Sequence, residues 1–377
     1  MPENYTAAII GLGSISRYHV TGYQGVDGVD IIAGADPSPL AREDFEKNVG
    51  VASLYEDANE MLSKEHPDIV SVCTWHGLHA QGVIDCAEAG VKGIICEKPM
   101  CVGLADSERM MDACSEHGTK LIIGHQRRHS AGWERARQLV AEGAIGEIIS
   151  AESRVGDGLL NCGTHAIDAI RYALGDPDTE WVFGAVERRT DRYERNVPIE
   201  DACMCLIQFA VGPQALIQVD LGPNPGGWFT LRGREGTMQV SEGLIELVNA
   251  GSGGLSKVET SHPDCHVSQL EELIAWIEGG PPHRSEARHG QAAVEIMMAL
   301  YESARRNEVI RMPLSETGFP LEAMIQDGLL PVKEPGAYDI RSFLVKGSEE
   351  QHLLQEMRDQ GKSQQEYVAE LRRRSNG

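Results

Sequence analysis

Short apolar runs alternate with helix-like segments along the first 125 residues. The runs are rich in isoleucine and valine, and they occupy residues 6–11, 29–36, 68–74, 92–97 and 120–125. Between them, apolar residues recur three or four positions apart, which is the spacing of one helix face. Short strands that are apolar throughout are typical of a parallel sheet covered on both faces by crossover helices. The pattern predicts a parallel α/β domain over residues 1–126.

The pattern changes after about residue 146. A helix is expected over residues 161–175. The apolar runs that follow are separated by glycine and proline, which suits a mainly antiparallel sheet. They cover residues 181–189, 202–210, 214–221, 227–233, 236–243 and 244–248, and helical spacing returns in residues 267–280 and 286–307. Residues 127–314 are therefore predicted to form an α+β domain, a sheet with helices packed on it.

Residues 315–377 form a C-terminal extension in this division. The first half of the extension is rich in turn formers, and its last thirty residues are polar. A polar segment with few apolar residues cannot bury enough surface to offset the entropy of ordering. We expect these last residues either to form an exposed helix or to remain mobile.

Length, charge and cysteine usage restrict the class of protein. A chain of 377 residues exceeds one typical core, so two domains are expected. Its formal charge of -23 opposes binding to nucleic acid and to anionic lipid. The sequence contains no apolar run of 18 residues, no signal-peptide pattern at its start, and nine scattered cysteines without a CxxC pair. These features predict a soluble, cytoplasmic protein with no nucleic acid, membrane or metal partner.

The segment GLGSIS, residues 11–16, follows the first apolar run and opens a helix-like segment. Gly11 would allow a tight turn, and Gly13 would let the backbone approach a pyrophosphate at a helix N-terminus. Ser16 takes the place of the usual third glycine or alanine. A simple turn is the alternative interpretation, but the position at the first strand-helix junction favours dinucleotide binding.

Asp36 ends the second apolar run, 23 residues after Gly13. A carboxylate at that place accepts hydrogen bonds from both hydroxyls of an adenosine ribose and repels a 2'-phosphate. Arg42 and Lys47 are not placed where a phosphate clamp is expected. Asp36 could instead be a turn residue in the segment DPSP. The carboxylate nevertheless favours NAD as the cofactor.

Five segments occur in a familiar order within residues 5–314. They are GLGSISRYH, TWHGLHAQGVIDCAEAGVKGIICEKP, NCGTHAID, RGREGTMQV and ALYESARRNEVIRMPL. Together they resemble the Gfo/Idh/MocA family, the glucose-fructose oxidoreductase and inositol dehydrogenase group. The resemblance implies a Rossmann domain followed by an open-faced, mainly antiparallel sheet, with the active site in the cleft between them. It also implies NAD(P)-dependent chemistry on a sugar, polyol or cyclitol, and a homodimer or homotetramer formed through the sheet.

The resemblance implies roles for two residues distant in sequence. Lys98 falls on the lysine of the family's EKP motif, at the end of a predicted strand, where its ammonium can stabilise a developing alkoxide. Glu97 would contact the cofactor ribose or the lysine, and the Lys98-Pro99 bond would be cis. His165 matches the family's substrate-domain histidine, which can remove a hydroxyl proton. The alternatives are a surface lysine at a turn and a histidine that only begins a helix.

Asn161 stands where the family usually carries aspartate. Helical spacing of i, i+4 would put Asn161 and His165 on one face, both able to reach a substrate. An amide can hydrogen-bond a hydroxyl but cannot accept a proton. We therefore expect Asn161 to orient a hydroxyl while His165 and Lys98 carry the proton chemistry. Asp168, one turn on, is expected to support the histidine or to cap the helix.

Further contacts are expected beside these residues. For the cofactor they are Ser14, Ile15, Thr74, Trp75 and His79, the last three from the segment TWHGLHA. Trp75 could stack on cofactor or sugar, or only fill the rim of the domain. In HQRRH, residues 125–129, Arg127 or Arg128 could bind a polyhydroxylated substrate, and we assign that contact to Arg128.

Three functions follow from these residues. The leading hypothesis is an NAD-dependent oxidoreductase that transfers a hydride between nicotinamide and a carbinol of a sugar, glycoside or cyclitol. A second is a glycoside hydrolase that keeps NAD bound, oxidises a ring carbon transiently, eliminates the aglycone and reduces the carbon again. A third is a non-enzymatic sensor of NAD or sugar, and Lys98 and His165 argue against it because a sensor needs neither group.

Overall fold

The computed structural model describes residues 4–222, 227–261 and 264–375. Its first part contains a six-stranded parallel sheet in the order β3-β2-β1-β4-β5-β6. The strands are β1 (Tyr5–Ile10), β2 (Val29–Ala35), β3 (Ser53–Tyr55), β4 (Ile69–Val72), β5 (Gly93–Cys96) and β6 (Lys120–Ile123). The five predicted runs all form strands of this sheet. The edge strand β3 was not predicted, because three half-buried residues give no apolar run.

Helices connect these parallel strands. They are α1 (Ser16–Gln24), α2 (Pro39–Val49), α3 (Ala58–Glu65), α4 (His79–Glu88) and α5 (Leu104–His117), with the 3-10 turn η1 (His76–Leu78) before α4. Side-chain caps fix two of the helix starts, because Ser38 accepts the Ala41 N–H at α2 and Asp57 accepts the Glu60 N–H at α3. Since all strands run the same way, the loops after their carboxyl ends meet at one edge of the sheet.

The second part is built on a nine-stranded sheet in the order β16-β15-β14-β13-β7-β12-β11-β8-β17. The strands are β7 (Ile148–Val155), β8 (Thr179–Glu187), β11 (Ala202–Phe209), β12 (Gln214–Val219), β13 (Phe229–Gly233), β14 (Gly236–Val240), β15 (Leu244–Asn249), β16 (Gly254–Glu259) and β17 (Ile310–Arg311). β7 and β12 are parallel, and the other neighbouring pairs are antiparallel. The mainly antiparallel sheet is confirmed, although β7 and β16 were not predicted.

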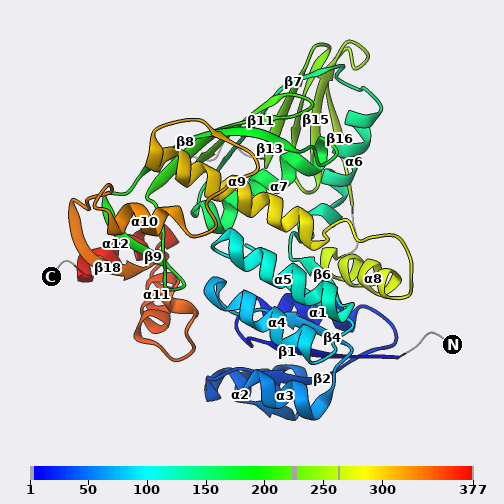
Figure 1. Cartoon of the computed structure of the whole chain (residues 1–377), viewed down its shortest axis with the longest axis vertical. Coiled ribbons are helices and arrows are strands. Elements are labelled where there is room, and N and C mark those ends of the chain that lie inside the picture. Colours follow the sequence, from blue (N-terminus) through cyan, green and yellow to red (C-terminus); the bar gives the residue numbers. More distant parts are fainter. Residues whose placement is uncertain (1–3, 223–226, 262–263, 376–377) are drawn as a thin grey trace.

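Helices cover one face of the nine-stranded sheet (Figure 1). They are α6 (Ala131–Ala141), α7 (Thr164–Ala173) and α9 (Ala287–Arg306), and a π-helical turn, η3 (Leu159–Gly163), leads into α7. In β11, Cys203 and Cys205 are buried, whereas Met204 between them is 39% exposed. This alternation shows that one face packs on helices while the other stays open.

One helix from the second half of the sequence returns to the first domain. α8 (Cys265–Ile277) packs on α1, and its Leu270 and Leu273 join an apolar cluster with Ile9 and Tyr23. The predicted division at residue 126 assigned this helix to the second domain. In space, residues 265–277 complete the core on one face of the parallel sheet (Figure 1).

The C-terminal extension is folded and packed. It contains α10 (Pro320–Gln326), β18 (Glu334–Asp339), the 3-10 turn η4 (Ser342–Leu344), α11 (Glu349–Asp359) and α12 (Gln364–Ser375). β18 joins β9 (Thr190–Glu194) and β10 (Val197–Pro198) in a three-stranded sheet. The last residues are helical, as one of the two expectations had it, but Tyr367 of α12 is fully buried, so this part is packed on the protein instead of being wholly exposed or mobile. The few apolar residues of α11 and α12 recur three or four positions apart, and this side of each helix packs on the rest of the protein.

None of the helices in the described part of the chain combines the length and apolarity needed to span a bilayer.

Candidate active site

The turn after β1 has the geometry of a dinucleotide loop. Gly11 has a φ of +88°, and a Cβ there would lie 2.7 Å from the Cys73 carbonyl oxygen, so only glycine fits. A Cβ at Gly13 would meet nothing within 4 Å, which leaves its backbone open to a ligand. α1 follows without a side-chain cap, so the N–H groups of its first turn are available to a pyrophosphate.

Asp36 is held at the end of β2 by two backbone groups. Its carboxylate accepts hydrogen bonds from the Leu12 and Ser38 N–H groups, each at 2.8 Å. Asp36 borders a cavity of ≈ 420 Å³ together with Gly11, Gly13, Thr74 and Trp75. The Arg42 guanidinium donates to the Asp36 main-chain oxygen and is not part of this lining. A fixed carboxylate without a free arginine suits the ribose hydroxyls of NAD.

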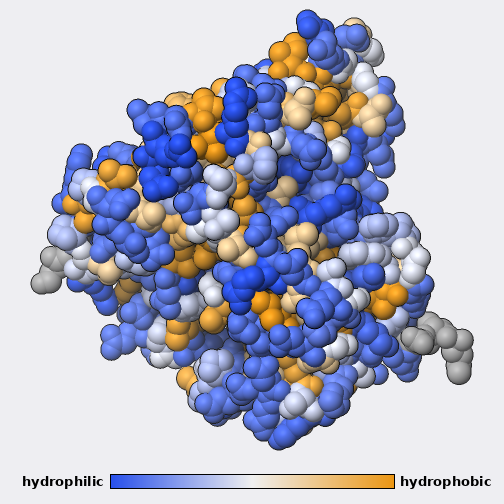
Figure 2. Space-filling model, in the orientation of Figure 1, coloured by the Kyte–Doolittle hydropathy of each residue, from blue (hydrophilic) through white to orange (hydrophobic). Residues whose placement is uncertain are grey.

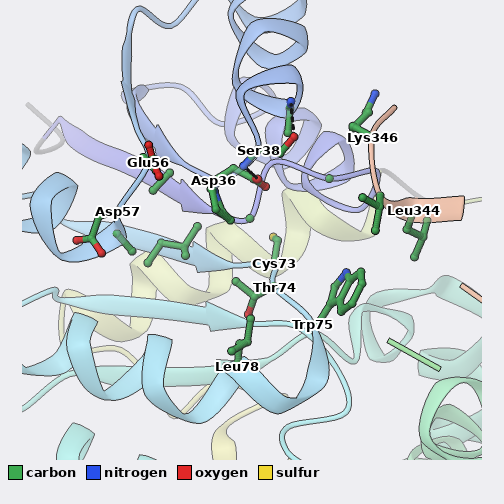
Figure 3. A pocket seen from close by; sticks show the side chains of 18 residues that line it. Asp36, Ser38, Glu56, Asp57, Cys73, Thr74, Trp75, Leu78, Leu344 and Lys346 are labelled. Atoms are coloured by element: carbon green, nitrogen blue, oxygen red, sulfur yellow. Dashed lines mark hydrogen bonds between the residues drawn. The ribbon is translucent and has the colours of Figure 1, made fainter. Parts of the chain in front are cut away.

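Thr74 gives a second sign that the cavity fits a polar ligand. Its hydroxyl oxygen is buried and has no hydrogen-bond partner among the described residues. A buried hydroxyl without a partner is costly, and a bound nucleotide would offer one. The residues around Gly13, Asp36 and Thr74 therefore fit NAD. Figure 3 shows Asp36 in the middle of this cavity and Trp75 at one end.

Three cavities follow one another and together form a single cleft. The second, of ≈ 280 Å³, shares Thr74 and Trp75 with the first and also includes Ser14, Ile15, Glu97 and Lys98. The third, of ≈ 460 Å³, shares Glu97 and Lys98 with the second and includes Asn161, His165 and Arg127. A ligand that fills the first two cavities ends at Lys98, where the third begins. We call the third the substrate cavity.

Lys98 crosses from the first domain to the second. The cis bond expected between Lys98 and Pro99 is present. The Lys98 ammonium donates to Asn161 Oδ1 at 2.7 Å and to the Asn161 main-chain oxygen at 3.1 Å. Asn161 lies in the π-helical turn η3, a wide turn of the kind often found at functional sites. Burial lowers the pKa of the Lys98 amine, and the cation of Arg195 lowers it further.

His165 lies one helical turn further on, at the start of α7. An Arg127 N–H donates to His165 Nε2 at 2.8 Å. Because arginine can only donate, Nε2 must accept and the ring proton must sit on Nδ1. Nδ1 is buried without a partner among the described residues. In this arrangement His165 can accept a substrate proton at Nε2 only after Arg127 moves aside.

The charge of His165 follows from its surroundings. Burial lowers the pKa of the imidazole well below its ordinary value, and the cations of Arg127 and Lys98 act in the same direction. The ring is therefore neutral near pH 7, as a proton acceptor must be. Arg127 itself lies 4.4 Å over the Trp228 ring and pairs with Glu242 at 2.7 Å.

Glu97 borders the cleft, but its carboxylate contacts His19 and the Lys98 main chain instead of the Lys98 ammonium. Its Oε1 lies 3.1 Å from His19 Nε2, and its Oε2 accepts the Lys98 main-chain N–H at 3.2 Å. It makes no hydrogen bond to the Lys98 ammonium. The carboxylate thus fixes the turn that carries Lys98, and its place in two cavities keeps a contact with the cofactor open.

Arg128 does not point into the substrate cavity, so its assignment to the substrate was wrong. Its guanidinium is fully buried and pairs with Asp168 at 2.6 Å and with Asp176 at 2.7 Å. Asp168 accordingly supports Arg128, not His165. Arg127 is the member of the pair that borders the cavity. Arg127 and Arg128 are neighbours in a short 3-10 turn, η2 (Gln126–His129), and their side chains point in different directions. The sequence HQRRH alone does not show which of the two faces the cavity.

His79 also has a different place from the one expected. It is fully buried, and its ring nitrogens lie 2.8 Å from the Pro99 carbonyl oxygen and 3.1 Å from that of Thr74. It borders none of the three cavities. His79 therefore holds two cleft-lining loops together from behind, and no direct cofactor contact is expected of it.

Further residues border these cavities. His76 borders the second cavity, and its Nε2 lies 3.1 Å from an Arg195 guanidinium nitrogen. Arg195 lies between β9 and β10, and its φ of 51° marks a tight hairpin turn. Leu344, Val345 and Lys346 of the C-terminal extension border the first cavity, and no sequence motif marked them.

Both halves of the chain match one family of oxidoreductases. Residues 5–125 match the domain described as the NAD-binding Rossmann fold of the oxidoreductase family, and residues 154–312 match its C-terminal alpha/beta domain. These two ranges cover well over half of the 377 residues.

Similar proteins span most of the chain at low identity. Myo-inositol 2-dehydrogenase of Thermotoga maritima is 24% identical over 330 residues, which cover 81% of this chain and 97% of that protein. D-glucoside 3-dehydrogenase of Escherichia coli is 23% identical over 332 residues, 79% of this chain and 94% of that protein. The fold is that of levoglucosan dehydrogenase in complex with NADH and levoglucosan, with a TM-score of 0.74 and 21% identity over 83% of this chain and 100% of that one. Taken with the matched domains, these likenesses show that the chain belongs to the Gfo/Idh/MocA oxidoreductase family, whose first domain is an NAD-binding Rossmann fold.

Proposed function

We propose that this oxidoreductase transfers a hydride between nicotinamide and a carbinol carbon of a sugar, glycoside or cyclitol. One observation carries the proposal. Lys98 from the first domain and His165 from the second border the same cavity, at the inner end of the cleft that fits the dinucleotide. The named relatives that act on inositol and glucosides support this substrate class.

The lining of the substrate cavity suits a ligand with many hydroxyl groups. Its volume of ≈ 460 Å³ lies within the range of about 300–1,000 Å³ that is usual for small-molecule sites. Beside Lys98 and His165 it includes Gln126, Asn161 and Glu242, which offer both donors and acceptors. Such a lining can orient a sugar ring by hydrogen bonds on several edges.

The residues of the chain have separate tasks in the proposed reaction. Bound NAD supplies the hydride acceptor. The Lys98 ammonium donates to the substrate oxygen and stabilises the negative charge that develops on it. Asn161 holds the Lys98 side chain and can hydrogen-bond a neighbouring hydroxyl. His165, neutral because it is buried among cations, accepts the hydroxyl proton once Arg127 has released Nε2.

A substrate panel with paired variants tests this assignment. Sugars, cyclitols and glycosides are incubated with NAD, and both NADH absorbance and released sugar are followed. On the best substrate, Lys98→Met should lower kcat by about 100- to 1,000-fold and His165→Ala by about 100-fold. Lys64→Met, which removes an exposed lysine on α3, serves as the control and should keep full activity.

Two outcomes would contradict the proposal. If Lys98→Met retained wild-type turnover, the lysine would have no part in the chemistry. If sugar were released from a glycoside without net NADH, the reaction would be redox-neutral elimination instead of simple dehydrogenation.

We further propose that the open face of the nine-stranded sheet joins copies of the chain in a homodimer or homotetramer. Phe183 of β8 and Met204 of β11 are 45% and 39% exposed on this face. Leu206, which pairs with Phe183 and with Leu216 of β12, lies on the same side. Figure 2 shows hydrophobic surface gathered over the part of the molecule that holds this sheet. Exposed large apolar side chains that gather on one sheet face are typical of a protein interface.

A further inference from the structure

The C-terminal extension reaches the cofactor cleft. Leu344, Val345 and Lys346 border the cavity that holds Asp36, and Leu344 also borders the next cavity, which includes Lys98. Figure 3 shows Leu344 and Lys346 on the same side of the cavity as Trp75. All three residues lie beyond residue 312, where the second family match ends.

The segment before these residues is fixed to the second domain. β18 runs parallel to β9, and the Ile340 N–H donates to the Tyr193 main-chain oxygen at 2.9 Å. The Arg341 guanidinium lies 3.4 Å from the Glu194 carboxylate, which is fully buried, and 3.5 Å from Asp157. Arg341 and Arg195 both pair with the buried Glu194 carboxylate, so loss of Arg341 would leave a buried acidic group with one partner fewer.

The segment after them is fixed to the first domain. The Lys346 ammonium lies 3.0 Å from Asp44 on α2. Hydrogen bonds from Lys346 and Arg17 lower the pKa of the Asp44 carboxyl, so the carboxylate stays ionised. The backbone at Gly347 passes close to Leu40, because a Cβ added there would lie 2.6 Å from Leu40 Cδ1. The chain therefore runs from one domain to the other across the dinucleotide cavity.

We propose that Ser342–Lys346 is a cofactor-binding strap that retains NAD on the enzyme. Leu344 and Val345 pack against the adenosine half of the dinucleotide, and the pair of Lys346 with Asp44 keeps the strap closed. NAD leaves only when this pair opens. This proposal depends on the NAD site of the family's first domain. It does not depend on the sugar proposed as substrate.

Cofactor release measures this role without any substrate. The full-length protein is loaded with NADH, mixed with a large excess of NAD, and the loss of bound-NADH fluorescence gives the dissociation rate. Lys346→Met should raise that rate about three- to fivefold, since the ion pair is partly exposed. Leu344→Asp should raise it by about tenfold or more, because a carboxylate then faces the cofactor phosphates and an apolar contact is lost.

A double-variant cycle separates the ion pair from a general effect. Asp44→Asn should speed release at least as much as Lys346→Met does, because it removes the same pair and also the pair of Asp44 with Arg17. The double variant should be no faster than the faster single variant, since both single changes remove the pair of Lys346 with Asp44. Lys362→Met, an exposed residue between α11 and α12, is the matched control and should release NADH at the wild-type rate. The cofactor content after desalting should fall in the same order as the rates rise.

Far-UV circular dichroism and the thermal midpoint show whether each variant is folded. Release within twofold of wild type in the folded Lys346→Met and Leu344→Asp variants would overturn the strap. So would additive effects of Asp44→Asn and Lys346→Met, because they would show that the two side chains act separately.

Discussion

Asn161 stands where the resemblance to the family led us to expect aspartate, and it contacts Lys98 through oxygens that carry no charge. Two neutral oxygens of Asn161 hold the Lys98 ammonium, at 2.7 and 3.1 Å. Neither brings a negative charge, so they position the amine without raising its pKa as a carboxylate would. Burial keeps the Lys98 pKa lowered although the nearby Glu97 carboxylate raises it. An ammonium with a lowered pKa is a stronger hydrogen-bond donor and acid, which suits the proposed donation to a substrate oxygen.

The Arg127 guanidinium is expected to set the acid limit of activity. It is one of the cations that hold the His165 pKa down, after burial. In Arg127→Met that cation is gone, so the His165 pKa rises, and the ring becomes protonated and inactive at a higher pH than in the wild type. The acid limb of log kcat/KM against pH should therefore shift to higher pH. Arg135→Met, an exposed arginine on α6, is the control.

An unchanged acid limb in Arg127→Met, or one shifted to lower pH, would show that His165 is not the group that must lose its proton. The readout separates this role from a structural one, because a loosened cavity would lower the rate at every pH without moving the limb.

The buried pair of His19 and Glu97 makes stability depend on pH. Burial opposes the imidazolium, but Cys73 and the Glu97 carboxylate raise the pKa of His19 from 6.5 to about 10. Burial also opposes the carboxylate, but His19 lowers the pKa of Glu97 from 4.5 to about 2. The His19 contribution is full below pH 6.5 and is lost as the pH rises toward 10, while that of Glu97 is full above pH 4.5 and is lost toward pH 2.

His19→Gln should therefore cost most stability between these two limits. We expect a loss of about 3 kcal/mol in the free energy of unfolding near pH 6, because a buried carboxylate is left without its charged partner. The loss should shrink toward pH 10. Urea unfolding of both proteins at the two pH values checks this, and a loss that does not change with pH would argue against a charged pair.

At the scale of the element, the spacing of apolar residues predicted most of the helices and strands that have a buried face. Four of the five apolar runs form strands that are buried almost throughout, and β2 is buried over its second half. α9 was recognised from its apolar spacing. β3 and β16 were missed because their residues are half-buried or exposed at sheet edges, where no apolar pattern is required. The C-terminal helices were misjudged because a few apolar contacts, such as Tyr367, sufficed to dock them.

Residues of the candidate site were predictable where a sequence motif lies at the end of a strand or the start of a helix. Gly11, Asp36, Lys98 and His165 border the cleft because strand ends and helix starts set their places. Side-chain direction within a short turn could not be predicted, which is why Arg128 was chosen although Arg127 borders the cavity. The strap could not be predicted either, because its contacts depend on how the extension crosses between the domains.

At the scale of the whole molecule, several contacts hold the two domains together, and three of them involve elements named above. α8 packs on α1, Lys98 bonds Asn161, and the strap joins β9 to α2. Lys98 and the strap border the cofactor cavities, so release of NAD is expected to depend on both of them. In Figure 1 the extension lies to one side of the first domain. The nine-stranded sheet lies beyond α7 and α9, on the side away from the first domain, and one of its faces is not covered by helices.

That uncovered face gives a prediction about assembly. Phe183→Asp with Met204→Asp places two carboxylates in the proposed interface, where burying them without partners is costly. Light scattering after gel filtration should show an oligomer for the wild type and a monomer for the double variant. Leu329→Asp, which changes an exposed leucine of the extension, should keep the wild-type mass. A monomeric wild type, or an oligomeric double variant, would remove this face as the interface.

The central claim is that an amine from one domain and an imidazole from the other act on a single carbinol. A crystal structure with NAD and the best substrate of the panel measures it most directly. We predict that one substrate oxygen lies within hydrogen-bond distance of both Lys98 Nζ and His165 Nε2, with Arg127 turned away from the ring. A substrate whose oxygens reach only one of these two groups, or a ring that still accepts from Arg127, would contradict the account.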